Sequence, residues 1–457
     1  MPKKVSIASH PHDNRRYMKA SIESRNKDKM PYESAIQYLF NLQKFGIKFG
    51  LSKTENILKA FGNPHLGQNY IHIAGTNGKG SVATFMGSIL QEAGYRVGTY
   101  VSPHLVRFTE RFRINGEEIS REKTTELINE LQAAFNPDEP PTFFEAVTAM
   151  AILHFAREKT DIAIMEVGMG GRLDATNVIT PLVTGITNIS MEHQEYLGNR
   201  LSHIAREKAG VIKKGIDVVT AVTQPQVIEQ FKAIAEERGA PLWRVGKDIK
   251  YRTTRSGLHF SGQSRHMKGL QLGLRGIHQA RNAALALGMM EQIETKGFPH
   301  TTEQIREGLK KADWPGRMQV IRERPTILLD GAHNAGAMRA LARSIQSDFS
   351  YDRLILVIGI MADKDIVALL RAIVPISDRV LYTRPVYSRA ADPRILMEKG
   401  QPLNTPGEVI PSLGEAIKKA EKIASPGDLI VICGSLFTVG EALTFFDPVR
   451  YKPDEFK

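Results

Sequence analysis

Apolar positions follow two patterns along the chain, and the way these patterns alternate predicts an α/β fold. Some segments are short apolar runs, which are typical of strands that a parallel sheet buries on both faces. Between them lie longer segments in which apolar residues recur at the spacing of one buried helix face. The predicted strands in the first half of the chain are 70–74, 96–101, 161–167, 183–189 and 217–222. Strands that alternate with helices favour a doubly wound parallel sheet.

Other segments before residue 314 add to this first domain. Residues 32–58 have helical spacing that is broken near residues 46–50, which predicts two helices and a loop. Residues 107–114 alternate charged and apolar side chains, as a strand does. Between residues 243 and 274 the pattern is short, polar and β-like, which predicts a small antiparallel annex. Further helices are predicted at 121–135, after a loop at 137–145, and at 279–293.

The segment Trp314-Pro-Gly-Arg317 interrupts these patterns and is the predicted domain junction. Four more apolar runs follow it, each separated from the next by a helix-like segment, at 326–330, 354–360, 379–383 and 428–433. They predict a second, smaller, Rossmann-like α/β domain without a phosphate loop of its own. The expected division is therefore an extension at 1–30, an ATPase-type domain at 31–314 and a C-terminal domain at 315–457.

A glycine-rich loop follows the first predicted strand, and the rest of the chain is organised around it. Residues 75–80 hold three glycines and Lys79, and a helix-like face begins at Val82. Such a loop lets backbone N–H groups close around phosphate at a helix N-terminus, with the lysine reaching the β- and γ-phosphates. The common form places a hydroxyl directly after the lysine, where Gly80 stands, so the hydroxyl is displaced to Ser81. The alternative is an ordinary glycine turn between a strand and a helix.

Composition limits the classes of protein to consider. A chain of 457 residues is too long for one core, and its single cysteine, Cys433, excludes an internal disulfide and reads as a small buried residue. No apolar run reaches the ~18 residues of a membrane span, and the N-terminus lacks the apolar core of a secretion signal. A cytoplasmic protein is expected.

The net charge of +12 is concentrated at the N-terminus, where residues 1–30 carry eight Lys/Arg against three acids, a net +5. This segment has no periodic apolar pattern and is predicted to be a flexible extension. A basic excess can indicate nucleic acid, anionic small substrates or solubility alone. No aromatic-basic motif accompanies it, so a nucleic-acid partner is not expected.

Polar residues at the carboxyl ends of the predicted strands are the candidates for chemistry, because open α/β sheets bind ligands at that edge. They are Lys79, Ser81, Ser102, His104, Glu166, His193, Asp330 and His333. Glu166 ends an apolar strand and is costly to bury unpaired, so a metal or a cation should accompany it. Glu166 could also be a plain salt-bridge carboxylate, His193 an ordinary loop residue, and residues 330–333 a tight turn. A hydroxyl, a carboxylate and an imidazole beside a triphosphate are plausible Mg²⁺ ligands.

These motifs resemble those of the folylpolyglutamate synthase/dihydrofolate synthase family, a branch of the Mur ligase superfamily. The resemblance covers roughly residues 32–440. The motifs occur in the family's order as Ala74-Gly-Thr-Asn-Gly-Lys-Gly-Ser81, Ser102-Pro-His-Leu-Val-Arg-Phe-Thr-Glu-Arg111, Glu166-Val-Gly-Met-Gly-Gly-Arg-Leu-Asp-Ala-Thr-Asn177, His193, Arg206-Glu-Lys-Ala-Gly210, His278-Gln-Ala-Arg-Asn282, Trp314-Pro-Gly-Arg317, Asp330-Gly-Ala-His-Asn334 and Asp363-Lys-Asp365. Gly-Lys-Gly-Ser is that family's own form of the phosphate loop. One departure is Glu192, where the family usually has Asp, and it puts the hydrogen bonding around His193 in doubt.

The resemblance implies a role for each site residue. The ATP-binding residues would be Gly75, Thr76, Asn77, Gly78, Lys79, Gly80, Ser81, Asn282, Arg317 and Asp330. The metal ligands would be Ser102, Glu166 and His193, with Ser81 near the metal-bound phosphates; the catalytic residues would be Lys79, Lys208, Asp330 and His333. Arg107, Phe143, Phe144 and Asp174 would contact the pterin or folate substrate. Lys208 matches a lysine that is carbamylated in the family, whereas without the resemblance it reads as a surface lysine. Phe143 and Phe144 could equally be core residues.

The implied activity is ATP-dependent ligation of L-glutamate to dihydropteroate and to reduced folates through an acyl phosphate. ATP and Mg²⁺ are the implied cofactors, with K⁺ as a further candidate, and a monomer with no membrane or nucleic-acid partner is expected. A polyglutamate synthase with one activity and a Mur-type ligase acting on a UDP-sugar peptide are the alternatives within the superfamily. From another class, a non-catalytic nucleotide-binding regulator would keep the loop but need not keep Glu166, His193 and His333 together.

Overall fold

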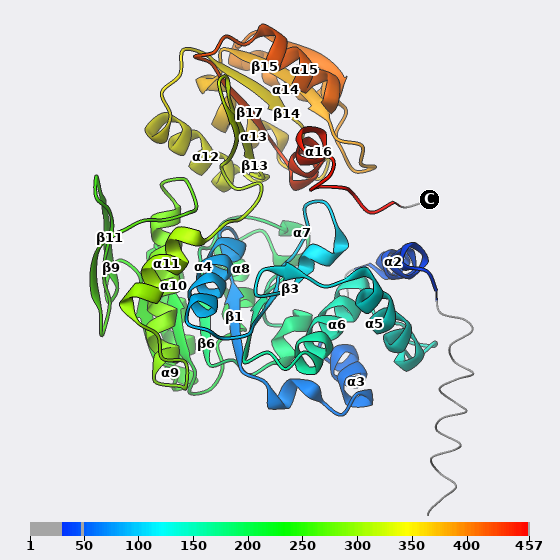
Figure 1. Ribbon diagram of the computed structural model, residues 1–457, viewed down its shortest axis with the longest axis vertical. Coiled ribbons are helices and arrows are strands. Elements are labelled where there is room, and N and C mark those ends of the chain that lie inside the picture. Colours follow the sequence, from blue (N-terminus) through cyan, green and yellow to red (C-terminus); the bar gives the residue numbers. More distant parts are fainter. Residues whose placement is uncertain (1–29, 47–49, 456–457) are drawn as a thin grey trace, which may run out of the picture.

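The computed structural model describes residues 30–46 and 50–455 (Figure 1). Residues 1–29, 47–49 and 456–457 lie outside the described residues, and so does the predicted basic extension apart from Met30. The described chain forms an N-terminal part, up to Lys311, and a C-terminal part, from Gln319 onward, each built on its own large sheet. No helix among the described residues is long and apolar enough to cross a membrane.

The N-terminal part is built on an eight-stranded sheet in the order β4-β3-β2-β5-β1-β6-β7-β8. Six neighbouring strands in this order, β2, β5, β1, β6, β7 and β8, run parallel. The other two, β3 and β4, form an antiparallel edge. Their bounds are β1 (Tyr70–Ala74), β2 (Val97–Tyr100), β3 (Phe112–Ile114), β4 (Glu117–Glu118), β5 (Ile162–Glu166), β6 (Val183–Ile186), β7 (Asp217–Thr220) and β8 (Leu242–Arg244). The parallel sheet predicted from the apolar runs is confirmed.

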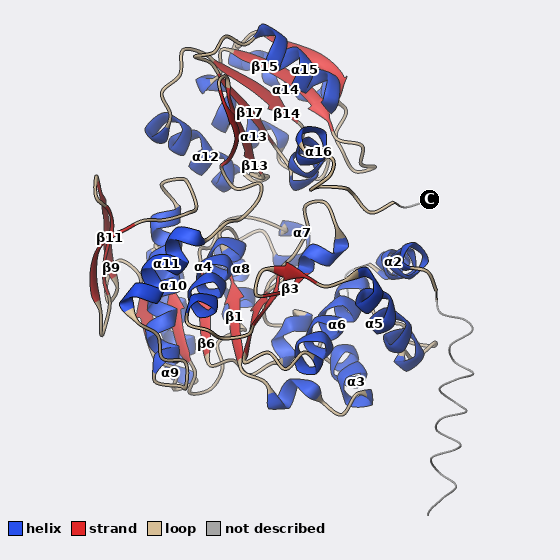
Figure 2. Ribbon diagram, viewed as in Figure 1, coloured by secondary structure: helices blue, strands red, loops and turns tan. Residues whose placement is uncertain are grey.

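Helices cover both faces of this sheet (Figure 2). They are α2 (Tyr32–Asn41), α3 (Ser52–Ala60), α4 (Lys79–Glu92), α5 (Arg121–Ala134), α6 (Phe143–Arg157), α7 (Gln194–Leu197), α8 (Leu201–Ala209), α9 (Pro225–Glu237), α10 (Gln279–Glu294) and α11 (Thr302–Lys311). Alternate residues of β1 serve the two faces: Ile71 and Ile73 pack with α4 and α10, and Tyr70 packs with α5 and α6. This two-sided burial is why β1 reads as a continuous apolar run.

A three-stranded antiparallel sheet stands beside α10 and α11 (Figure 2) and confirms the predicted annex. It comprises β9 (Lys250–Thr254), β10 (Gly257–Ser261) and β11 (His266–Leu270). Glu291 of α10 accepts hydrogen bonds from the backbone N–H groups of Gln263, Ser264 and Arg265, which anchors the β10–β11 turn.

The C-terminal part is a six-stranded sheet in the order β12-β13-β17-β14-β15-β16, parallel except for β12. Its strands are β12 (Gln319–Glu323), β13 (Thr326–Asp330), β14 (Leu354–Ile358), β15 (Arg379–Arg384), β16 (Gly407–Ser412) and β17 (Leu429–Cys433). Its helices are α12 (Ala335–Asp348), α13 (Ile366–Ile373), α14 (Pro393–Gly400), α15 (Leu413–Ile423) and α16 (Leu436–Phe446). The four predicted strands are all present, and β12 and β16 are the two edge strands that the sequence did not reveal.

Three local predictions differ from the structure. Residues 108–111 form a 3₁₀ turn, so only 112–114 is a strand; the Glu110 carboxylate accepts three backbone N–H groups, from 105, 106 and 107, and closes the loop. Phe143 and Phe144 lie in the first turn of α6 rather than in a loop, because Thr142 and Glu145 form a capping box. The third and fourth predicted strands after β1 end earlier, at Ile186 and Thr220. Further 3₁₀ turns are η2 (Leu42–Phe45), η3 (Pro64–Gly67), η5 (Ala175–Val178), η6 (Val374–Ile376) and η7 (Gln401–Leu403).

The arrowheads of β1 and β6 point toward the C-terminal part in Figure 2, so the loops at the carboxyl ends of these strands face it. The C-terminal tail returns to the N-terminal part, where the Asp454 carboxylate accepts hydrogen bonds from the Tyr32 hydroxyl and the Phe108 N–H and pairs with Arg121. The edge of the sheet that binds ligands in open α/β folds thus lies between the two parts.

Candidate active site

The glycine loop, residues 75–80, connects β1 directly to α4. Gly78 is the N-cap of α4, with φ of 89°, and Gly75 has φ of 134°. Glycine is required for contact as well as conformation: a Cβ on Gly75 would lie 1.9 Å from Thr187 Oγ1, and one on Gly78 would lie 2.6 Å from Asn282 Oδ1. The loop therefore has the strand–loop–helix geometry of a phosphate-binding loop, and Asn282 lies against it as the resemblance implies.

Lys79 starts α4 and folds back over the loop. Its Nζ donates hydrogen bonds to the carbonyl oxygens of Gly75, at 3.1 Å, and Thr76, at 3.2 Å. The same Nζ lies 3.8 Å from Glu166 Oε1. If a phosphate bound to the Lys79 ammonium group, a charged partner would replace these two carbonyl oxygens.

Glu166 is buried at the end of β5, which pairs with β1 so that Glu166 lies opposite Ile73. Burial raises the pKa of its carboxyl group, while the charges of Lys79 and Arg317 and a hydrogen bond from the Ser102 backbone oppose that rise. The cation that lies beside Glu166 is thus Lys79, about ninety positions away in the sequence. Its positive charge balances the negative charge of the buried carboxylate.

Lys208 lies beneath the loop with a side chain only 2% exposed. The surface position expected from its sequence pattern alone is therefore wrong, because α8 packs this lysine inward. Its Nζ lies 2.7 Å from Glu192 Oε1 and donates a hydrogen bond to the Gly75 carbonyl oxygen at 2.9 Å. Burial lowers the pKa of Lys208, and Glu192 opposes that shift. Two lysines, Lys79 and Lys208, thus share the Gly75 carbonyl group from two sides.

The residues assigned to the metal come from four segments. Ser81 lies in the first turn of α4 and accepts a hydrogen bond from Gln279 Nε2 at 3.2 Å. Ser102 follows β2 and its N–H contacts Glu166, whereas His193 is exposed and left-handed (φ of 45°) at the N-cap of α7. Among the described residues no group of three His, Cys, Asp or Glu side chains is arranged as a metal site. The assigned set contains only two such side chains, and its hydroxyl and carboxylate oxygens, completed by nucleotide phosphates, suit Mg²⁺.

Asp330 and His333 follow β13 in the C-terminal part. Both Asp330 oxygens are used within the turn, where they accept the N–H groups of Met318, at 2.9 Å, and Ala332, at 2.8 Å. His333 Nδ1 lies 2.9 Å from the Gly331 carbonyl oxygen, so Nδ1 carries the proton and Nε2 is left as an acceptor. Burial lowers the pKa of His333 to about 4, which keeps the ring neutral. Asp330 is therefore a residue that shapes the turn, and His333 is the one with a free ring nitrogen.

Asn334 brings the C-terminal part onto the glycine loop. Its Nδ2 donates to Asn77 Oδ1 at 2.8 Å, and Asn77 Nδ2 donates back to Asn334 Oδ1 at 3.3 Å. Asn77 N–H also donates to Asn188 Oδ1 at 3.0 Å. Arg317 passes close to Gly331, since a Cβ there would lie 2.4 Å from Arg317 Nη1. In the sequence, Asn77 and Asn334 lie in separate motifs, and nothing in either motif shows that they pair.

An aromatic cluster surrounds the first turn of α6. Phe143 stacks on Phe40 with ring centroids 5.3 Å apart, and the Arg111 guanidinium lies 5.4 Å above the Phe143 ring. His104 packs edge-on against Phe40 and accepts a hydrogen bond from Arg111 Nε on its Nδ1. Such a cluster offers both stacking faces and a cation to a flat heterocycle. His104 and Arg111 belong to this cluster, a role that the sequence did not reveal.

Phe144 and Asp174 meet at Gly168, the turn after β5. A Cβ on Gly168 would lie 2.3 Å from Phe144 Cζ, and Asp174 accepts hydrogen bonds from the N–H groups of Met169, at 2.9 Å, and Thr176, at 3.0 Å. Asp174 is buried, which raises the pKa of its carboxyl group. Its oxygens already hold the turn together, so it has less capacity for a ligand than a solvated carboxylate would have.

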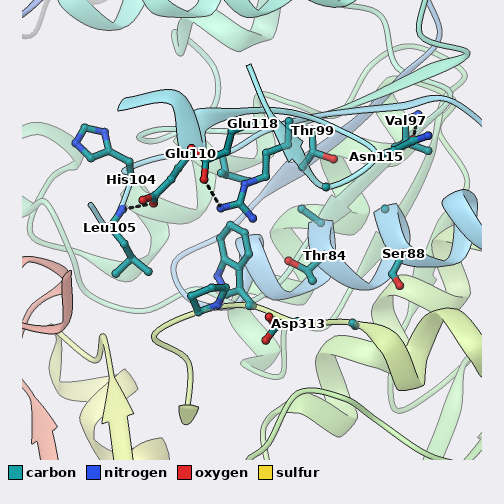
Figure 3. Close-up of a pocket in the computed structure, with 18 of the residues that line it drawn as sticks. Thr84, Ser88, Val97, Thr99, His104, Leu105, Glu110, Asn115, Glu118 and Asp313 are labelled. Carbon is teal, nitrogen blue, oxygen red and sulfur yellow. Dashed lines mark hydrogen bonds and ion pairs between the residues drawn. The ribbon is translucent and has the colours of Figure 1, made fainter. Parts of the chain in front are cut away.

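Arg107, the fourth predicted substrate residue, is committed elsewhere. Its guanidinium pairs with Glu118, at 2.7 Å from Oε1, and donates to the Arg450 carbonyl oxygen at 2.8 Å. It lines a cavity of about 380 Å³ beside α4, and this lining does not include residues 75–80. Figure 3 shows Thr84 and Ser88 of α4 facing Thr99 and Glu118 across this cavity. Arg107 is thus placed across a cavity from α4 and does not join Phe143, Phe144 and Asp174.

Comparison with known proteins agrees with this architecture. The family model of the Mur ligase middle domain matches residues 73–290, and that of the Mur ligase glutamate ligase domain matches residues 316–436. The chain is 35% identical over 422 residues to the dihydrofolate synthase/folylpolyglutamate synthase of Bacillus subtilis, covering 90% of this chain and 98% of that protein.

Two solved structures are similar over nearly their whole length. E. coli FolC in complex with DHPP and ADP superposes with a TM-score of 0.86 at 33% identity, covering 92% of this chain and 99% of that one. A bifunctional folylpolyglutamate synthase/dihydrofolate synthase with Mn, AMPPNP and L-glutamate bound has a TM-score of 0.81 at 32% identity, covering 91% of this chain and 99% of that one.

Proposed function

Because this chain belongs to the dihydrofolate synthase/folylpolyglutamate synthase family of the Mur ligases, we propose that it ligates L-glutamate to dihydropteroate and to reduced folates at the cost of ATP. The observation that carries the proposal is the pair of opposed charges at the glycine loop, the partly buried Lys79 and the buried Glu166. A loop, a lysine and a carboxylate in this arrangement suit a metal–nucleotide complex.

The reaction proceeds in two steps. A carboxylate oxygen of the pterin substrate attacks the γ-phosphorus of ATP, the bond to the β-phosphate oxygen breaks, and an acyl phosphate and ADP result. The amine nitrogen of L-glutamate then attacks the acyl carbon and loses a proton as phosphate leaves, which forms the amide. A carboxylate is a poor electrophile by itself, so the protein's task is to hold the reactants in line and to balance phosphate charge.

The residues of the loop supply most of that positioning. Lys79 would turn from the carbonyl groups of Gly75 and Thr76 to the nucleotide phosphates, while Lys208 keeps the Gly75 carbonyl group in place from below. His333, with a pKa of about 4, is too weak a base to be charged at neutral pH. Its free Nε2 instead suits a hydrogen-bond acceptor that orients the incoming ammonium or amine of glutamate. Asn282 and Arg317 would contact the nucleotide.

The oxygen-rich residues Glu166, Ser102 and Ser81, with His193, would hold Mg²⁺. When bound, the ion screens the charge of the phosphates and so favours attack by an anionic carboxylate. ADP, AMPPNP and Mn in the structures of relatives support ATP and a divalent ion as cofactors. K⁺ is proposed as a second cation on the family resemblance alone.

The aromatic cluster around Phe143 is proposed as the pterin pocket, with Phe144 and Asp174 at its inner wall. Arg107 is proposed to serve from the neighbouring cavity. The DHPP bound to the E. coli relative supports a dihydropteroate-type substrate. The narrower alternative, a synthase of polyglutamates only, is consistent with the same loop and the same cluster. An enzyme acting on UDP-sugar peptides is disfavoured by the aromatic lining.

Carbamylation of Lys208 is also proposed. Burial lowers its pKa, which raises the fraction of neutral amine that reacts with CO₂. The carbamate would be anionic and would face Glu192, which lies 2.7 Å from Nζ, so Glu192 would have to turn away. A ¹³C-bicarbonate-dependent carbamate resonance that is lost in Lys208→Arg would support this modification, and its absence at saturating bicarbonate would exclude it.

We further propose the functional division into residues 31–314 and 315–457, with 1–30 as an extension that catalysis does not need. The break between the two large sheets near residue 314 supports this division. We also propose that the protein is a cytoplasmic monomer without nucleic-acid partners.

The decisive experiment offers dihydropteroate and tetrahydrofolate separately to the purified enzyme, each with ATP, Mg²⁺ and L-glutamate, and measures ADP together with the ligated product. Product from both substrates is expected. Product from tetrahydrofolate alone would reduce the enzyme to a polyglutamate synthase. No product from either, with a folded protein that still binds ATP, would contradict the proposal.

A further inference from the structure

The glycine loop touches the C-terminal part through one pair of side chains, Asn77 and Asn334, which are 257 positions apart in the sequence. Among the hydrogen bonds described for residues 75–81, those of this pair are the ones that cross to the C-terminal part. Other interdomain bonds lie at the margins, from Ile277 N–H to Ser344 Oγ, from Arg107 to the Arg450 carbonyl oxygen, and from the N-terminal part to Asp454. The central contact is therefore made by the loop that is expected to hold the nucleotide.

The orientation of the two amides is determined by their neighbours. Asn334 Oδ1 accepts the N–H of Ala337 at 2.9 Å as the N-cap of α12, so its Nδ2 must point away from the helix, toward Asn77. Asn77 is held from the other side, because its N–H donates to Asn188 Oδ1 at 3.0 Å. Two reciprocal hydrogen bonds between planar amides fix both the distance and the angle between the groups that carry them.

The first turn of α12 also packs against the glycine loop. A Cβ on Gly336 would lie 3.5 Å from Asn77 Nδ2 and 3.5 Å from Ser190 Oγ, so the start of α12 lies against the glycine loop and the loop after β6. His333 immediately precedes Asn334. A displacement of the amide pair would therefore move the free ring nitrogen of His333 relative to Lys79.

We propose that Asn77 and Asn334 form an interdomain latch, which holds the C-terminal part in register with the glycine loop. The latch makes Asn334 a positioning residue: it acts on the reaction through Asn77 and His333. It is a two-state element, bonded when the parts are aligned and broken when they separate, and so links the position of the glycine loop to that of His333. Its kinetic consequence rests on the proposed function, whereas its structural consequence does not.

The test uses Asn334→Ser in the full-length chain. Serine is an N-cap residue of similar rank to asparagine, so α12 keeps its cap, but its side chain is too short to reach Asn77. The matched control is Asp392→Ser, which makes a comparable exchange at the N-cap of α14, away from the loop. Spin labels at Glu236→Cys and Glu398→Cys report the distance between the two parts; both positions are exposed, and the native Cys433 is buried.

We expect one narrow distance distribution in the labelled parent protein and in the Asp392→Ser control. In Asn334→Ser we expect a broader or shifted distribution, at an unchanged thermal midpoint. An unchanged distribution would overturn the latch. This measurement needs no folate, so it decides the matter even if the chain ligated neither substrate.

A kinetic cycle tests the same idea independently. At saturating ATP, Asn334→Ser should slow ligation by roughly 5- to 150-fold, the loss expected when two neutral hydrogen bonds are broken. Adding it to Asn77→Ala should cause little further loss, because the latch is already broken. Losses that multiply would show that the two asparagines act separately, and the latch would be wrong.

Discussion

Replacing Glu192 by glutamine isolates the buried ion pair beneath the glycine loop. Glu192 Oε1 lies 2.7 Å from Lys208 Nζ, whose side chain is 2% exposed. The exchange keeps the shape of the side chain and one acceptor oxygen but removes the negative charge. In the protein with unmodified Lys208, this lysine is then a buried ammonium without a counter-charge, held by the Gly75 carbonyl group and the remaining amide oxygen.

The magnitude follows from two limits. Removing one partner of a buried pair typically costs about 3–5 kcal/mol. The cost cannot exceed that of deprotonating Lys208 at pH 7, which is about 4.6 kcal/mol for an unfolded-state pKa near 10.4. Because glutamine keeps an acceptor, the lower limit of about 3 kcal/mol is expected. At roughly 2–4 °C per kcal/mol for a domain of this size, the thermal midpoint should fall by roughly 6–12 °C.

The deficit should depend on pH with a definite sign. Burial already lowers the folded-state pKa of Lys208, and loss of Glu192 removes the charge that opposes this shift. The unfolded state then binds more protons than the folded state between the two pKa values, so stability rises with pH in that window. The difference between variant and parent is therefore largest at neutral pH or below and shrinks as the pH approaches about 10.4.

Thermal unfolding followed by circular dichroism between pH 6 and 9.5 measures this effect. Glu195→Gln is the matched control, because it removes the same charge at an exposed position of α7. Glu192→Asp keeps the charge and should lose much less stability than Glu192→Gln. Equal midpoints for Glu192→Gln and Glu195→Gln at pH 7, or a deficit that grows with pH, would refute the reasoning.

Four further predictions concern activity. Lys79→Ala should abolish ligation in a folded protein, and near-normal turnover at saturating ATP would remove this lysine from the phosphate site. Glu166→Gln should lose activity because Mg²⁺ binds more weakly, so that a higher Mg²⁺ concentration is needed. An unchanged Mg²⁺ titration and rate would show that Glu166 is only a salt-bridge carboxylate. Asp174→Ala should lower kcat/KM for dihydropteroate by roughly 10- to 150-fold, as expected for loss of a charged hydrogen bond of about 1.5–3 kcal/mol, and affect tetrahydrofolate much less; equal losses would make it only the turn residue that its bonds to Met169 and Thr176 suggest. Deleting residues 1–30 should leave kcat unchanged, and a collapse of kcat in a folded truncation would contradict this.

The sequence by itself determined the features that depend on neighbouring residues. The apolar run at 70–74, three glycines and the helical face after Lys79 predict a strand, a loop and a helix, and the structure has them at those positions. Repetition of such units predicted both α/β sheets and the annex. These choices are made within a few residues by backbone freedom and side-chain periodicity, which a linear pattern records directly.

Edge strands and loop details were harder to predict, because weak or polar patterns are decided by what packs on them. Residues 319–323 and 407–412 became β12 and β16 only because a sheet edge was available. Phe143 is helical because Thr142 and Glu145 form a capping box at the start of α6. The prolines just before this box made the segment resemble a loop in the sequence.

The partnerships of the site residues were decided by tertiary structure alone. Glu166 lies beside Lys79 because β5 is next to β1 in the strand order. Lys208 contacts Glu192 and Gly75 because α8 packs under the loop. Asn77 finds Asn334 only through the docking of the C-terminal part. Motifs show which side chains reach the carboxyl edge of the sheet, but the strand order and the packing of helices set which of them touch, because those contacts join residues far apart in the sequence.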